Sequence, residues 1–117
     1  MRDGNEYREL TRNLSHAISD LRRDKPDVMQ GFSAMASAAM ADGVLERKQK
    51  ELMALAIGVA THCKGCIGFH TKALLSLDVS REEFEEALGV AIYMGGGPSL
   101  MYAAEAMRAF EELAVEQ

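Results

Sequence analysis

The stretch His62-Cys63-Lys64-Gly65-Cys66-Ile67-Gly68-Phe69-His70 holds both cysteines of the chain and two of its three histidines. A Cys-x-x-Cys pair places two thiols about one helical turn apart, close enough to form a disulfide. Because His70 follows Cys66 by four residues, a helix would bring its imidazole to the same face as that sulfur. A helix that begins near Cys63 would also favour thiolate over thiol, through its unpaired N–H groups and its macrodipole. The stretch therefore offers a second sulfur, a nearby base and a positive helix end, which dithiol chemistry requires.

Three other interpretations of this stretch stay open. The cysteines could be small core residues, as buried cysteines often are. Alternatively, Cys63, Cys66, His70 and His62 could hold zinc in a structural or binding protein, although four ligands within nine residues would be cramped on a helical backbone. The protein could also be a non-catalytic oligomeric scaffold whose disulfide senses the redox state. We favour a thiol role, because a cysteine pair and a histidine on the thiol face rarely coincide by chance.

Length and composition bound the fold class. A length of 117 residues predicts a single domain spanning 1–117. A composition of 48% hydrophobic and 26% charged residues is typical of a globular protein. Alanine, leucine, methionine and glutamate are abundant whereas strand-forming clusters are absent, which predicts an all-α fold. No apolar run approaches the ~20 residues of a membrane span. The sequence has no basic stripe, so binding to nucleic acid or to anionic lipid is not expected.

The N-terminus predicts where the protein resides. Its first residues, Met-Arg-Asp-Gly-Asn-Glu, include acidic side chains and no apolar core of a signal peptide. We therefore expect a cytoplasmic protein. In the cytoplasm a Cys-x-x-Cys pair is more often catalytic or metal-binding than a structural disulfide.

The periodicity of apolar residues predicts six helices. The third should be the most buried, because residues 52–60 include no charged or strongly polar side chain. The second should carry a broad apolar surface rich in small residues, and two such helices are too apolar for a small monomer. A capping box opens the fifth helix and a Gly95-Gly96-Gly97 triplet ends it. The expected helices run from about 6 to 23, 26 to 41, 46 to 61, 64 to 77, 80 to 94, and from Pro98 to beyond residue 110.

With these features, the chain resembles the alkyl hydroperoxidase D-like branch of the carboxymuconolactone decarboxylase family. The resemblance covers roughly residues 26–113. It implies a compact bundle of about six helices, with the Cys-x-x-Cys at the start of a central helix, assembled as a homo-oligomer (a trimer or a hexamer). The residues that carry it are Glu51, Cys63-x-x-Cys66 and His70, with Asp42-Gly43-Val44-Leu45 upstream and Ser80-x-Glu82-Glu83-x-x-Glu86-Ala87 downstream.

The resemblance also implies an antioxidant activity without a cofactor. In that branch the dithiol reduces a peroxide, forms a redox-active disulfide and is re-reduced by an external thiol carrier such as a lipoylated protein. A disulfide reductase acting on a small-molecule substrate would use the same site. The decarboxylase branch typically lacks the cysteine pair, so decarboxylation is not expected here.

The predicted catalytic residues are Glu51, Cys63, Cys66 and His70. His70 would accept the proton of Cys66 and Glu51 would hold His70 in the useful tautomer. We expect Cys66 to be the activated thiol, with Cys63 as the competitor. In a straight hairpin Glu51 would lie roughly 6 Å beyond the level of His70, so side-chain reach or an angled crossing must close the gap. The alternative for Glu51 is an exposed carboxylate in a first helical turn.

Overall fold

The protein is described by a computed structural model that covers residues 4–115. These residues form six helices and no strand, so the all-α prediction is confirmed. No helix in this part of the chain combines the length and the apolar character needed to cross a bilayer. The helices are α1 (Glu6–Asp24), α2 (Pro26–Met40), α3 (Arg47–Ala60), α4 (Lys64–Ser76), α5 (Arg81–Gly95) and α6 (Gly97–Ala114).

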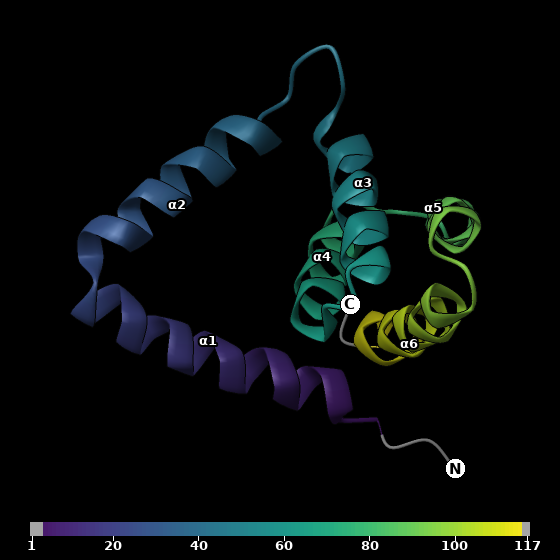
Figure 1. Cartoon of the computed structure of the whole chain (residues 1–117), viewed down its shortest axis with the longest axis horizontal. Helices are drawn as coiled ribbons and strands as arrows, with labels where there is room; N and C mark the ends of the chain where they lie inside the picture. Colours follow the sequence, from purple (N-terminus) through teal and green to yellow (C-terminus); the bar gives the residue numbers. More distant parts are fainter. Residues whose placement is uncertain (1–3, 116–117) are drawn as a thin grey trace.

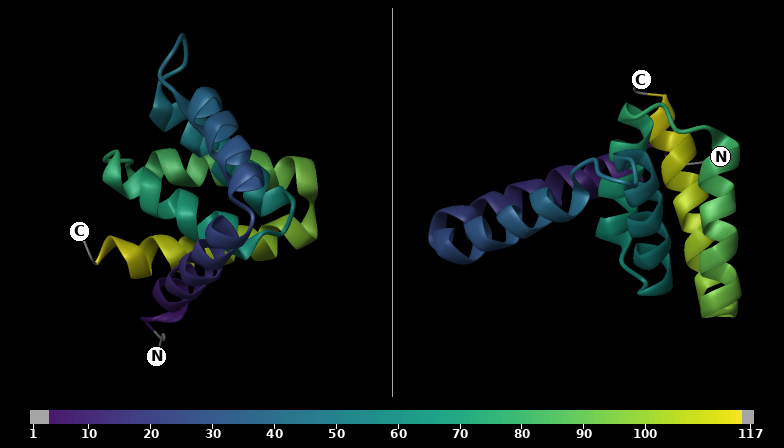
Figure 2. Two further views of the ribbon diagram at one scale, coloured as in Figure 1. Left: turned by 90° about the vertical axis from the view of Figure 1, so that its left-hand side faces the viewer. Right: turned by 90° about the horizontal axis from the view of Figure 1, so that it is seen from above.

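Helices α3 to α6 form the body of the molecule, in which α3 packs against α4 and α5, and α6 packs against the same two helices. Consecutive helices run in opposite directions, so the α3–α4 and α5–α6 turns lie at the same end of the body (Figure 2, right). Large apolar side chains from all four helices meet between them and are buried: Leu55, Val59, Ile67, Leu74, Phe84, Leu88 and Leu113.

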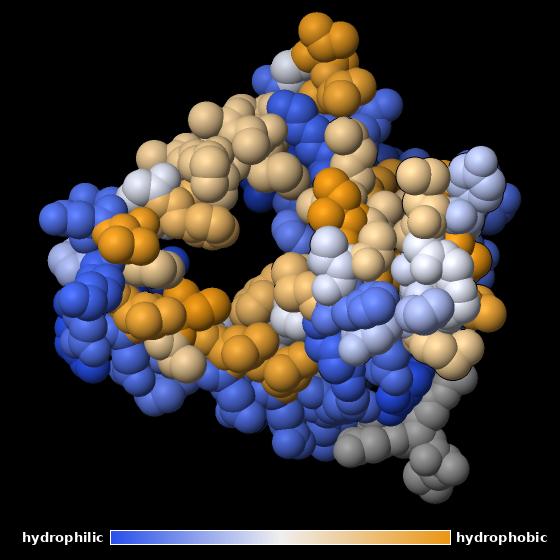
Figure 3. All heavy atoms as spheres, in the orientation of Figure 1, coloured by the Kyte–Doolittle hydropathy of each residue, from blue (hydrophilic) through white to orange (hydrophobic). Residues whose placement is uncertain are grey.

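Helices α1 and α2 form a hairpin that projects from this body like an arm (Figures 1 and 2). The body covers only the first part of α1, through Tyr7 and Thr11, and no residue of α2 is buried. Apolar side chains line the opening between the arm and the body (Figure 3). The broad apolar surface predicted for the second helix is therefore present, and within the single chain it stays exposed.

The prediction that the third helix would be covered on most sides is wrong for one face of α3. Leu55 and Val59 are fully buried, but Met53 and Ile57 are 53% and 61% exposed. Residues 52–60 of this helix are apolar on every side, whereas neighbouring helices of the same chain cover only the sides that face α4 and α5.

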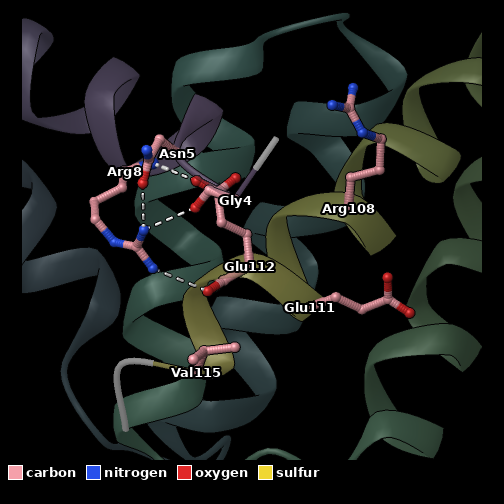
Figure 4. A pocket seen from close by; sticks show the side chains of 7 residues that line it. All are labelled: Gly4, Asn5, Arg8, Arg108, Glu111, Glu112 and Val115. Atoms are coloured by element: carbon pink, nitrogen blue, oxygen red, sulfur yellow. Dashed lines mark hydrogen bonds between the residues drawn. The ribbon is translucent and has the colours of Figure 1, made fainter. Parts of the chain in front are cut away.

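A carboxylate on α6 caps the start of α1 across the fold. Asn5, the residue before α1, makes no side-chain cap. Instead the Glu112 carboxylate accepts hydrogen bonds from the backbone N–H groups of Tyr7, at 3.0 Å, and Arg8, at 3.1 Å. The Arg8 guanidinium donates to the carbonyl oxygens of Gly4 and Glu112 (Figure 4). The otherwise unpaired donors of a helix N-terminus thus attach the arm to the body.

A network of charged side chains joins α1, α4 and α6 beside the cysteines. Lys64 Nζ lies 2.9 Å from Glu6 Oε2, and Arg108 lies 2.6 Å from the other oxygen of Glu6. The Tyr7 hydroxyl donates to Glu105 at 2.7 Å. Burial, and then the nearby Glu105 carboxylate, raise the pKa of Tyr7, while the hydrogen bond from Lys64 lowers the pKa of Glu6. Because the pKa of Glu6 is lowered in the folded state, its stabilising contribution is present at neutral pH and is lost on acidification below the usual range of a carboxyl group.

The contact between α1 and α4 depends on Gly68, which leads to a stability prediction. A Cβ at Gly68 would lie 2.7 Å from Cγ2 of Thr11, a buried residue whose hydroxyl is already hydrogen-bonded to the Tyr7 carbonyl. Gly68→Ala is therefore expected to lower the free energy of unfolding by about 1–2 kcal/mol through overpacking, in spite of the higher helix propensity of alanine. Urea denaturation followed by circular dichroism measures it.

Gly89→Ala is the matched control, since Gly89 lies inside α5 and a Cβ added there would have no atom within 4 Å. This substitution should leave stability unchanged or raise it by up to about 1 kcal/mol. Equal effects at the two positions would contradict the proposed role of Gly68 in the close approach of α1 and α4.

Candidate dithiol site

The turn between α3 and α4 is a Schellman motif that places Cys63. The N–H of His62 donates to the Val59 carbonyl at 3.1 Å, and the N–H of Cys63 donates to the Gly58 carbonyl at 2.9 Å. His62 takes the left-handed conformation that such a motif requires, with a φ of 60°. Cys63 then serves as the N-cap of α4. One short turn therefore ends α3 and starts α4.

Cys63 and Cys66 are joined by a disulfide, with their Cα atoms 5.2 Å apart. The backbone N–H of Cys66 donates to Cys63 Sγ at 3.1 Å. This N–H is one of the unpaired donors of the first turn of α4, and in the reduced protein it would stabilise negative charge on the Cys63 sulfur. The sequence favoured Cys66 as the activated thiol, whereas the helix-terminal hydrogen bond goes to the sulfur of Cys63.

Gly58 allows α3 to approach the disulfide. A Cβ at this position would lie 2.9 Å from the Cβ of Cys66. The neighbouring residues Val59 and Ile67 are fully buried, so neither helix has free space to move into. The packing of α3 against the disulfide therefore requires a glycine at position 58. No local pattern in the sequence indicates this role.

Glu51 and His70 form a hydrogen bond between α3 and α4, in which the carboxylate is buried and the imidazole is partly exposed. Glu51 Oε1 lies 2.7 Å from His70 Nδ1, and Arg47 Nε lies 3.7 Å from Glu51 Oε2. Glu51 is 3% exposed, so the alternative of an exposed first-turn carboxylate is wrong. Because a carboxylate only accepts hydrogen bonds, we assign the proton of the neutral imidazole to Nδ1, which leaves Nε2 as the basic nitrogen. The 2.7 Å contact shows that the separation expected for a straight hairpin is closed in the fold.

A cavity of about 480 Å³ opens beside this pair, between α2 and the α3–α4 pair. Arg47, Glu51 and His70 supply its polar wall, and the rest of its lining comes from the end of α2 and the following residue, with Ala36, Ser37, Met40 and Ala41. Neither cysteine lines this cavity. The four predicted residues thus fall into two adjacent groups, the disulfide at the turn and the Glu51–His70 pair one helical turn further along α4.

Two aromatic residues beside the disulfide were not placed in the site by sequence reasoning. His62, considered there only as a zinc ligand, stacks on Tyr102 of α6, with 4.6 Å between ring centroids and 8° between ring planes. No pattern within the Cys-x-x-Cys stretch indicates Tyr102, which follows it by more than 30 residues. Within residues 4–115 no group of three or more His, Cys, Asp or Glu side chains is arranged to hold a metal ion.

The packing at Gly58 leads to a test of the site. Gly58→Ala is expected to displace Cys66 from α3, because the added methyl group would meet the Cβ of Cys66 well inside van der Waals contact. The displacement should lower the free energy of unfolding by about 1–3 kcal/mol and make the Cys63–Cys66 disulfide easier to reduce. Redox titration with dithiothreitol, followed by mass shift after alkylation, measures the second effect. Gly89→Ala is again the control, and a disulfide of unchanged redox potential in Gly58→Ala would contradict the assignment.

Comparisons with known proteins agree with the fold. Residues 26–109 match the sequence profile of the carboxymuconolactone decarboxylase family. A crystal structure of a carboxymuconolactone decarboxylase family protein from Legionella pneumophila superposes with a TM-score of 0.93 at 50% identity, covering 94% of this chain and 98% of that one. An uncharacterized protein of Cupriavidus necator is 35% identical over 89% of this chain and 98% of its own length. An uncharacterized protein of the cox locus of Paracoccus denitrificans is 29% identical over 85% and 89%.

Proposed function

The chain belongs to the carboxymuconolactone decarboxylase family, and we propose that it is a dithiol peroxidase of the alkyl hydroperoxidase D-like branch. The observation that carries the proposal is the position of the Cys63–Cys66 pair at the N-terminus of α4, one turn before a histidine hydrogen-bonded to a buried carboxylate. A purely structural disulfide needs neither a buried glutamate nor a histidine oriented by it.

In the proposed reaction the reduced protein attacks a hydroperoxide. The thiolate of one cysteine attacks an oxygen of the peroxide, the O–O bond breaks, and the leaving alkoxide takes a proton to give an alcohol. The resulting sulfenic acid is attacked by the second cysteine, which forms the disulfide and releases water. An external dithiol such as a lipoylated protein then reduces the disulfide by thiol–disulfide exchange, most readily in the reducing cytoplasm. The sum is one peroxide and two thiols converted into one alcohol, one water and one disulfide.

We assign the first attack to Cys63 and the resolving step to Cys66. The N-cap hydrogen bond from the Cys66 N–H supports thiolate character at Cys63. Cys66 shares its face of α4 with His70, whose Nε2 would accept the Cys66 proton as the disulfide forms. Glu51 would orient the ring and stabilise the imidazolium that results. Cys66 as the attacking thiol, with His70 as its base, is the competing assignment.

Substitution of the four residues tests the activity. Cys63→Ser and Cys66→Ser should abolish dithiol-dependent peroxide consumption. His70→Ala should lower its rate by about 10²–10⁴-fold, the usual contribution of a general base, and Glu51→Gln should cause a smaller loss because the imidazole remains. Consumption of cumene hydroperoxide or hydrogen peroxide with dihydrolipoamide as the reductant is the measurement. His16→Ala, an exposed histidine on α1, is the control for loss of a histidine.

The rate of alkylation of each cysteine shows whether Cys63 or Cys66 is the attacking thiol. In the reduced protein, iodoacetamide should react faster with Cys63 than with Cys66 at neutral pH, as resolved by peptide mass. If dihydrolipoamide reduces the Cys63–Cys66 disulfide but peroxide is not consumed, the peroxidase proposal is overturned. A disulfide reductase is then the remaining function for the site.

We also propose that the protein is a homo-oligomer, a trimer or a hexamer, in which a second copy covers α2. The support comes from charge and exposure. Residues 28–41 include no Asp, Glu, Lys or Arg, and no residue of α2 is buried. Val28, Phe32 and Met35 are each more than half exposed. Such a helix would be costly to leave in water.

Light scattering tests the assembly. The particle mass should be a multiple of the 12.8 kDa chain mass at micromolar concentration. Phe32→Glu should lower the mass by placing a charge in the interface. Val44→Glu is the control, because Val44 is a fully exposed apolar residue in the loop after α2. A wild-type mass equal to that of one chain would contradict the oligomer.

A further inference from the structure

A histidine occupies a backbone position that favours glycine, next to the cysteine that we assign as the attacking thiol. His62 has a φ of 60°, in the left-handed region that most residues with a side chain avoid. The helix-ending motif that it belongs to places glycine there most often, because glycine adopts this conformation without strain. A side chain retained at such a position next to a candidate active site suggests that the ring has a function.

The ring of His62 is held by a residue from a different helix. It stacks almost parallel on Tyr102 of α6, with a centroid distance of 4.6 Å. The contact is available because the α3–α4 and α5–α6 turns lie at the same end of the body (Figure 2, right). Offset parallel stacking of this kind is a favoured geometry for two aromatic rings.

Both residues that flank Cys63 contact other helices. Lys64, on the C-terminal side, contacts Glu6 of α1 at 2.9 Å and Glu105 of α6 at 3.8 Å. His62, on the N-terminal side, contacts Tyr102 of α6. Tyr102 and Glu105 lie three residues apart on one face of α6, so that face holds the chain on either side of Cys63.

We propose that the His62–Tyr102 stack positions Cys63, so that its sulfur stays at the hydrogen-bond donor of Cys66 when the disulfide is reduced. This inference rests on the proposed dithiol function. In the oxidised protein the disulfide itself keeps Cys63 Sγ near the Cys66 N–H. After reduction that covalent restraint is gone, and the position of the sulfur depends on the backbone on either side of Cys63 and on the rotamer of its side chain. The stack restrains the turn through His62, and thereby maintains the hydrogen bond that favours the thiolate.

Four variants test this proposal on the reduced protein. His62→Gly removes the ring and also relieves the backbone strain, so its melting temperature should be equal to or higher than that of the wild type. In spite of this, the pH profile of Cys63 alkylation should shift to higher pH, with a rate at neutral pH about tenfold lower. Tyr102→Leu should produce the same shift. His62→Phe and Tyr102→Phe each retain two stacked rings, so both variants should keep the wild-type pH profile of Cys63 alkylation.

Asp78→Gly is the matched control for strain relief. Asp78, in the turn between α4 and α5, is the other residue with a side chain and a positive φ in the described part of the chain, at 59°. The substitution should give a similar gain in stability without any change in the Cys63 profile. Alkylation of Cys66 in each variant serves as an internal reference, because the hydrogen bond in question ends at the sulfur of Cys63 and not at that of Cys66.

The outcomes separate this proposal from its alternatives. An unchanged Cys63 profile in both His62→Gly and Tyr102→Leu would overturn it. The proposal would also be overturned if His62→Phe shifts the Cys63 profile while Tyr102→Leu leaves it unchanged. That result would assign the shift to loss of the imidazole nitrogens of His62. The alkylation profile needs no peroxide turnover. A wild-type protein that does not consume peroxide therefore refutes the peroxidase proposal, while the profile still decides the role of the stack.

Discussion

The turn from Thr61 to Cys63 is the constraint on which the rest of the site depends. Within three residues the chain ends α3, reverses direction and starts α4, and its backbone N–H groups donate to the carbonyls of Ile57, Val59 and Gly58. The same geometry leaves the first N–H groups of α4 unpaired, and one of them points at the Cys63 sulfur. Because Cys63 is both the last residue of this turn and the N-cap of α4, its sulfur lies at a helix N-terminus. The tight turn therefore both reverses the chain between α3 and α4 and places the Cys63 sulfur.

Charged groups surround this turn in two distinct arrangements. On one side the buried Glu51 carboxylate contacts the partly exposed His70 ring and the exposed guanidinium of Arg47, and these contacts satisfy a carboxylate that would otherwise be costly to bury. On the other side Glu6, Lys64, Glu105 and Arg108 form a partly exposed network that holds α1 and α6 against the start of α4. Water screens the second set, so its main contribution is to geometry more than to stability. In the first set the buried Glu51 carboxylate is hydrogen-bonded to His70 Nδ1, which is the orientation that the proposed proton transfer requires.

The arm shows that the single chain leaves a substantial apolar surface without a partner. Helix α1 attaches at its N-terminal end, through Tyr7, Thr11 and the capping carboxylate of Glu112. Helix α2, with no buried residue, contributes part of the wall of the cavity at Glu51 and His70. A partner that covers α2 would therefore also affect the environment of that pair. In the proposed oligomer, assembly and chemistry would therefore be linked through α2.

Local sequence features determined much of this protein by themselves. The Ser80 capping box, the glycine triplet at 95–97 and the apolar periodicity predicted six helices whose bounds lie within a few residues of those observed. The Cys-x-x-Cys spacing likewise determined that two sulfurs lie within bonding reach at the start of a helix. These features are local because helix caps, periodicity and a three-residue spacing involve hydrogen bonds and contacts within one or two turns of the chain.

Only the tertiary structure decided which residues from distant parts of the chain meet. Glu51 contacts His70 because α3 and α4 pack side by side, and the periodicity of a helix defines its apolar face without defining how that face packs on a neighbouring helix. Tyr102 reaches His62 because two turns lie at the same end of the body. The exposure of Ile57 and Phe32 was likewise undetermined by sequence. An apolar pattern shows that a face needs covering, whereas the packing of the whole chain decides whether one of its own helices is available to cover it.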